Sequence, residues 1–218
     1  MPTKFLLMLK KLNSLFFVHL DEHLNWKPHI SSDGSKLQRA NGILSKIRHN
    51  VPLKSLINIY HGIFGSHIRY ASQIWGLYDN TVTHRILTLQ KTAVRLITFS
   101  NPRSPSLLIF SELELLKFFD LVEVINILLI HQHFNENLPS DTLATLNFDK
   151  IQHSIGTRGN ILGLLRPSNV KTYKYGINSL TRLTIQQWNK LQQHHTSINL
   201  SNLNAVKIKI TGTQSSFI

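Results

Sequence analysis

The chain has 218 residues, 42 % of them hydrophobic, which is enough to bury a core and excludes a wholly disordered chain. It has no cysteine, which excludes disulfide scaffolds, thiolate zinc sites and cysteine nucleophiles. The formal net charge is +13, of which +10 falls in residues 1–109 and +3 in residues 110–218, so a polyanionic partner is expected for the first half.

The first residues resemble a secretion signal only briefly. The apolar run Phe5–Leu9 ends at Lys10 and Lys11 and is shorter than the apolar region of a usual signal peptide. No later apolar run approaches the roughly 20 residues that span a bilayer. We therefore expect an intracellular chain, cytoplasmic or nuclear, that is not secreted and has no membrane partner.

Residues 1–26 are predicted to contain a small β element, a strand or one arm of a hairpin. Apolar and polar side chains alternate over residues 18–24, which is the period of a half-buried strand. On the polar face, His19, Asp21 and His23 have a spacing compatible with a metal ion. A solvent-facing polar strand face is the favoured interpretation, and we predict neither a metal site nor a cofactor for this chain.

A first helix is predicted from Pro28, which suits the first turn of a helix, to the residues before Pro52. Its apolar side chains fall on one helical face. The basic side chains Lys36, Arg39 and Lys46 lie together on one flank of that face.

Two further helices are predicted over residues 53–75 and 81–99, each with a continuous apolar face. Gly62 and Gly65 weaken the first of these helices locally or allow close packing. Prolines at positions 102 and 105 then break the chain. Residues 27–103 are therefore expected to form a basic helical domain.

The remainder of the chain is predicted to be a less basic helical region over residues 104–195, followed by a polar tail over 196–218. It should contain a helical pair over residues 106–135, a short strand at Thr172–Tyr175 and a last helix around Trp188. The fold class is mainly α, a helical bundle with a small N-terminal β element and a short C-terminal strand.

Charge of one sign dominates the basic helical domain. Between Lys27 and Arg103 there are eleven Lys and Arg residues but only two acids, Asp33 and Asp79. Such a surface attracts polyanions and releases condensed counterions on meeting a nucleic-acid backbone, although a merely solubilising face is the alternative. The candidate nucleic-acid-binding residues are Lys36, Arg39, Lys46, Arg69, Arg85, Lys91 and Arg95.

Four aromatic side chains of the same region, Trp26, Tyr60, Tyr70 and Trp75, are of the type that stacks on bases. Trp75 shares the apolar face of its helix, so we expect it in the core instead.

Several phrases of the sequence occur in an order and spacing typical of one protein family. They are His19–Ile30, Ser35–Lys46, Ile59–Phe64, Ile68–Gly76 and Leu87–Arg95, followed by Tyr173–Tyr175 and Trp188–Leu191. Together they resemble the thumb and following C-terminal region of reverse transcriptases of non-LTR (LINE-type) retrotransposons. The resemblance implies a thumb-like three-helix core that grips an RNA or RNA/DNA template–primer duplex through its phosphates, beside the palm and fingers of an intact enzyme.

The sequence also departs from that family. Polymerisation by the family requires an Asp-Asp pair and an upstream Asp that hold Mg²⁺, whereas this chain has no Asp-Asp pair. Phe16-Phe17 stand where the family has Leu-Gly, and Asp33-Gly34 are expected to fray the first helix. We expect a truncated copy or fragment that is no enzyme by itself, with Mg²⁺ needed only in the intact parent polymerase. The alternative is a small helical structural or protein-interaction remnant without a nucleic-acid role.

Overall fold

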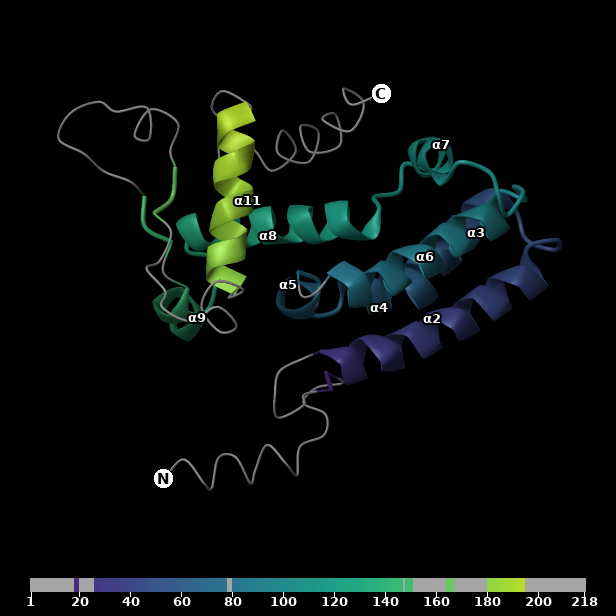
Figure 1. Cartoon of the computed structure of the whole chain (residues 1–218), viewed down its shortest axis with the longest axis horizontal. Helices are drawn as coiled ribbons and strands as arrows, with labels where there is room; N and C mark the ends of the chain where they lie inside the picture. Colours follow the sequence, from purple (N-terminus) through teal and green to yellow (C-terminus); the bar gives the residue numbers. More distant parts are fainter. Residues whose placement is uncertain are drawn as a thin grey trace, which may run out of the picture. The chain divides into compact units, whose positions relative to one another are not determined.

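The computed structural model describes residues 18–19, 26–77, 80–146, 148–150, 164–166 and 180–194, and these are overwhelmingly helical (Figure 1). The predicted mainly helical fold class is confirmed. The predicted N-terminal β element lies outside the described residues apart from Val18 and His19, as do the predicted strand at 172–175 and the tail. Within the described ranges the β pairing is limited to isolated bridges, such as the antiparallel bridge between Lys150 and Leu165. None of the described helices is long and apolar enough to cross a membrane.

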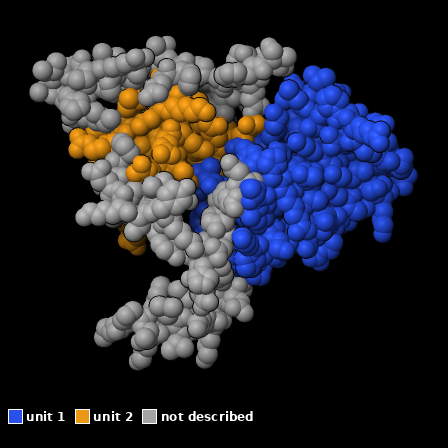
Figure 2. Space-filling view, viewed as in Figure 1, with its two compact units in different colours: residues 1–119 blue, residues 120–218 orange. Residues whose placement is uncertain are grey.

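The chain divides into two compact units, residues 1–119 and 120–218, which Figure 2 draws in blue and orange. The predicted domain boundary after Arg103 stays a prediction. Within the first unit, the buried side chain of Gln90 bonds to the Leu116 carbonyl at 2.9 Å and the Phe118 amide at 2.8 Å. The connection after Arg103 therefore belongs to the first unit.

The first helix, α2 (Lys27–Ile47), begins with a proline in its first turn, as predicted. It buries Ile30, Leu37 and Leu44. It also continues without a break through Asp33 and Gly34, which were expected to fray it. The reason is that Asp33 is buried and bonded to the Lys36 ammonium at 2.7 Å, so this side chain is satisfied within the helix.

The predicted second helix is instead a series of short segments. They are α3 (Leu53–Ile59), a π-helical segment η1 (Tyr60–Gly65), α4 (Ser66–Arg69) and α5 (Ser72–Trp75). The π-helical segment contains both glycines that were expected to weaken the helix. The second break comes at Ala71, whose backbone is left-handed with φ 50°. The Trp75 indole N–H then donates to the Tyr70 carbonyl at 3.0 Å and fixes the bend.

The third helix, α6 (Asn80–Ile97), packs along α2 (Figure 1). Its buried face includes Ile86, Val94 and Ile97, together with the polar Gln90. Gln90 also donates to the Tyr60 hydroxyl at 2.9 Å, so one amide side chain connects α6 with η1. A short helix, α7 (Ser106–Glu112), follows and packs against α6 within the same unit.

The second unit is formed by most of α8 (Phe118–Phe134), together with α9 (Ser140–Thr145) and α11 (Leu180–His194). In α11 the side chain of Asn189 makes two hydrogen bonds of 2.8 Å to the backbone N–H and C=O of Leu165. Its neighbour Trp188 is fully buried. Of the C-terminal sequence phrase, Asn189 therefore anchors the loop at Leu165 on the last helix, and Trp188 belongs to the core.

Candidate nucleic-acid interface

The negative charge of the described α2–α6 segment is confined to one buried carboxylate. Asp33 is the only acid in residues 26–77 and 80–97, and it is 3 % exposed. Its oxygens face the Lys36 ammonium at 2.7 Å and the His29 ring at 3.4 Å. Burial lowers the pKa of His29, which Asp33 partly opposes. The described surface of α2–α6 therefore presents no exposed carboxylate to a polyanion.

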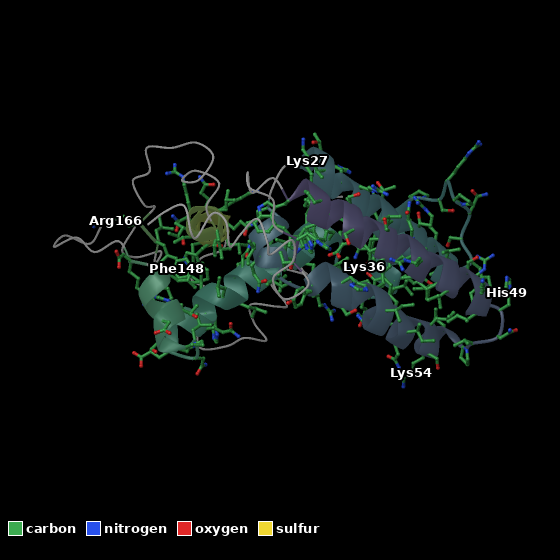
Figure 3. All side chains as sticks on the ribbon, turned by 90° about the horizontal axis from the view of Figure 1, so that it is seen from below. Lys27, Lys36, His49, Lys54, Phe148 and Arg166 are labelled. Atoms are coloured by element: carbon green, nitrogen blue, oxygen red, sulfur yellow. The ribbon has the colours of Figure 1, made fainter. Side chains whose placement is uncertain are left out.

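Three of the candidate residues belong to α2. Arg39 and Lys46 are exposed and lie opposite the buried Leu37 and Leu44, while Lys36 is on the flank toward α4. The Arg39 guanidinium makes one long bond within the helix, from Nε to the Ser35 carbonyl at 3.4 Å. Figure 3 shows Lys36 on this helix, with Lys54 on the neighbouring segment. The charged ends of Arg39 and Lys46 are thus available to solvent or to a ligand.

Two more candidates, Arg69 and Arg85, are exposed but rest against their own unit. The Arg69 guanidinium lies 3.4 Å from Nδ1 of His61, whose pKa is lowered by burial and by this arginine. The Arg85 guanidinium lies over Gly34 of α2, where an added Cβ would come within 3.3 Å of Nε. Glycine at position 34 therefore lets Arg85 lie close against α2. We call Lys36, Arg39, Lys46, Arg69 and Arg85 the basic surface.

The last two candidates, Lys91 and Arg95, are half-buried on α6. Arg95 donates from Nε and Nη2 to the Ser104 carbonyl, at 3.2 and 2.9 Å. This arginine anchors the connection between α6 and α7. Because Arg95 is engaged within the first unit and Lys91 is half-buried, we do not count this pair with the basic surface.

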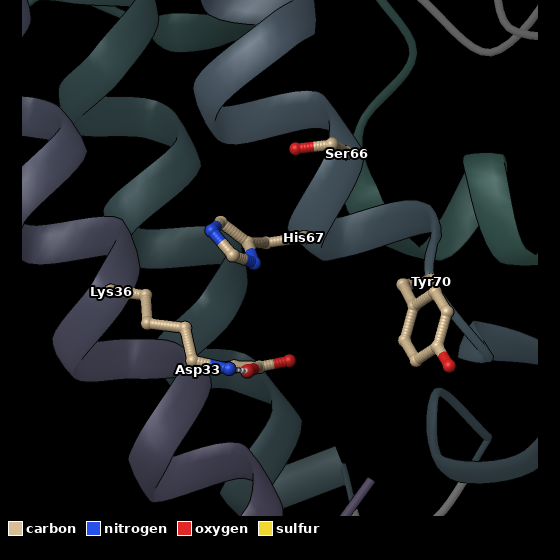
Figure 4. A pocket seen from close by; sticks show the side chains of 5 residues that line it. All are labelled: Asp33, Lys36, Ser66, His67 and Tyr70. Carbon is tan, nitrogen blue, oxygen red and sulfur yellow. Dashed lines mark hydrogen bonds and ion pairs between the residues drawn. The ribbon is translucent and has the colours of Figure 1, made fainter. Parts of the chain in front are cut away.

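A groove between α2 and α4 adjoins the basic surface (Figure 4). Its volume is about 430 Å³, and its lining comprises Asp33, Lys36, Ser66, His67 and Tyr70. Sequence reasoning did not select Ser66 or His67, because neither belongs to a charge pattern or a motif. They reach the groove only because α4 ends beside α2.

Of the four aromatic candidates for base stacking, only Tyr70 is well exposed. Its exposed fraction is 44 %, whereas Tyr60 is 2 % exposed and Trp75 is fully buried, as predicted for Trp75. Trp26 is half-buried at the start of α2. Tyr70 is therefore the described aromatic residue best placed to stack on a base.

The polar strand face with metal-compatible spacing is described only at His19, since Asp21 and His23 lie outside the described residues. Among the residues that are described, no three His, Asp or Glu side chains come together as metal ligands.

No family model, curated protein or solved structure matches this chain. Interpretation of the basic surface and of the groove therefore depends on their own geometry and chemistry, together with the order of the sequence phrases.

Proposed function

We propose that this chain binds the phosphate backbone of an RNA or RNA/DNA duplex through the basic surface, without reading the sequence. It would act as the thumb-like grip of a LINE-type reverse transcriptase. The observation that carries this proposal is the asymmetry of charge: five candidate cations surround α2 and α4, while the single described acid of α2–α6 is buried and paired with Lys36. Phosphate contacts of this kind position a duplex and carry no sequence information.

The physical basis of the binding is the release of counterions. Each phosphate that a Lys or Arg neutralises frees condensed cations, and log K falls with log salt by about 0.9 per contact. If three to five groups of the basic surface make contact, the slope should lie between roughly −3 and −4.5. Such binding is weak near physiological salt and strong at low salt.

We expect no polymerisation by this chain alone. In-line phosphoryl transfer with two Mg²⁺ needs a set of carboxylates that face the reacting phosphate. Asp33 instead lies buried against the Lys36 ammonium. Nucleotide addition would be carried out by a palm domain, and this chain would hold the duplex beside it.

The proposal is tested by reversing charge on the outer face of α2. The double variant Arg39→Glu with Lys46→Glu should weaken duplex binding at least tenfold, because two phosphate contacts become repulsive. The matched control is Arg166→Glu with Lys190→Glu, two exposed residues of the second unit that change the net charge equally. An equal loss in both variants would mean that net charge alone drives binding, and circular dichroism must show unchanged helicity.

A second candidate function is favoured by α7, where Leu107 and Leu108 are 41 % and 65 % exposed. Adjacent exposed leucines are typical of a protein-interaction surface. In that case the chain is a helical interaction remnant, and wild-type protein will not bind a duplex even at low salt. Replacing both leucines by serine distinguishes the two functions, because duplex binding through the basic surface does not involve α7.

A further inference from the structure

We infer that the groove between α2 and α4 binds one unpaired nucleobase at the end of the duplex held by the basic surface. This inference rests on the proposed function and assigns a specific ligand to a site beside it. The groove lies wholly within the first unit. A nucleobase is the occupant that the charge and shape of the groove favour.

The size and lining of the groove suit a single nucleoside. Its volume of about 430 Å³ falls within the range of roughly 300–1,000 Å³ of small-molecule sites. One wall is α2 with Asp33 and Lys36, and the other is the end of α4 with Ser66, His67 and Tyr70. Figure 4 shows His67 and Tyr70 across the groove from the Asp33–Lys36 pair. A planar ring therefore meets polar groups on one side and an aromatic ring on the other.

The carboxylate of Asp33 does not select the base. It is 3 % exposed and is bonded to the Lys36 ammonium at 2.7 Å, so it is satisfied by its own helix. The base is therefore held by stacking, which does not depend on its identity.

Stacking and phosphate contacts come from the end of α4. Tyr70 lines the groove and is 44 % exposed, and stacking on its aromatic ring tolerates every base. The exposed Arg69 precedes it in the chain, and the Lys36 side chain is 28 % exposed at the opposite wall. A base in the groove would place its flanking phosphates near these two cations. The cations explain why the occupant is part of a polyanion rather than an apolar peptide.

The test compares the affinity of the full chain for two RNA/DNA duplexes by fluorescence anisotropy, one blunt and one with a single unpaired 3′ guanosine. The overhang should tighten binding on the order of tenfold, since stacking of a base on an aromatic residue has this size. An unpaired uridine should give a gain of similar size, because stacking on an aromatic ring tolerates every base. Tyr70→Ala should abolish the gain and Tyr70→Phe should keep it. The matched control Phe99→Ala removes an aromatic side chain that is 53 % exposed at the other end of the same unit, and it should also keep the gain.

The outcomes separate this inference from the proposed function. If the blunt duplex binds and the overhang adds nothing, the groove assignment is overturned and the grip remains. If the overhang binds through Tyr70 while the blunt duplex does not bind, the groove is supported and the grip is overturned. A gain that survives Tyr70→Ala also overturns the groove assignment.

Discussion

At the scale of single residues, the side chain of Gln90 on α6 forms hydrogen bonds with other segments of the first unit. Its amide nitrogen donates to the Tyr60 hydroxyl and the Leu116 carbonyl, and its oxygen accepts from the Phe118 amide. All of these groups meet at the side chain of Gln90, which is fully buried. The network joins three separate stretches of the first unit.

We predict that Gln90→Ala destabilises the first unit by about 3 kcal/mol, because removing one side chain leaves several buried polar groups without a partner. Urea unfolding followed by circular dichroism measures the change. The control Gln38→Ala, at an exposed position of α2, should change stability by less than about 0.5 kcal/mol. Similar losses in the two variants would show that the network is not formed.

The Tyr60 hydroxyl in this network predicts a dependence of stability on alkaline pH. Burial raises the pKa of Tyr60 from its ordinary value of 10.0 to about 12. The folded state therefore holds the proton more tightly than the unfolded state. Its contribution is fully present below pH 10 and is lost as the pH rises through 12, a change of about 3 kcal/mol.

Urea midpoints at pH 9 and pH 11.5 test this prediction, with Tyr60→Phe as the reference because lysines also titrate in that range. The wild type should lose more stability than Tyr60→Phe between the two pH values. Equal losses would mean that the pKa of Tyr60 is not raised in the folded state.

The sequence predicted which face of α6 is buried only approximately, and Gln90 is the reason. Val82, Leu89 and Leu96 belong to the apolar face that predicts the helix over residues 81–99, but these residues are only half-buried. The buried face is rotated toward Thr83 and Gln90. A pattern of apolar residues cannot anticipate this rotation, because hydrogen bonds to distant segments satisfy the buried amide.

At the scale of the elements, the region of residues 53–75 departs most from its prediction. One helix was expected, whereas the chain passes through a π-helical segment and a left-handed residue before Trp75. The apolar positions alone do not reveal the breaks, because short segments bent against α2 and α6 bury a similar set of side chains. In the sequence, only the two glycines of η1 indicated that the predicted helix could be interrupted.

Ala71 makes this bend testable. A left-handed backbone costs an L-residue roughly 1–2 kcal/mol that glycine does not incur. Ala71→Gly should therefore raise the free energy of unfolding by up to about 1 kcal/mol, measured as a higher Tm. The same change in a regular helix, Ala40→Gly in α2, should lower the Tm. A lower Tm for both variants would contradict the left-handed conformation at Ala71.

The candidate site was predictable by residue type but not by arrangement. The sequence alone shows which Lys and Arg residues make up the run of positive charge. That Arg95 bonds to the Ser104 carbonyl follows from the path of the loop after α6, and that Arg85 lies over Gly34 follows from the packing of α6 on α2. Both depend on tertiary contacts, which local patterns do not determine.

At the scale of the whole molecule, the more basic half of the sequence corresponds roughly to the first compact unit. The first unit contains the basic surface and the groove, and the second unit contains a separate core in which Asn189 holds Leu165 on α11. Electrostatic binding is therefore expected to belong to the first unit. We propose that the first unit binds the phosphates of a duplex without reading its sequence.

A phosphate grip is tested by the salt dependence of duplex binding by the full chain. The Kd for RNA/DNA duplexes of several unrelated sequences is measured by anisotropy from about 50 mM to about 200 mM KCl. Binding through phosphates predicts a linear plot of log K against log salt with a slope of roughly −3 to −4.5, the same for every sequence. A Kd that does not change with salt, or no binding at the lowest salt, would contradict it.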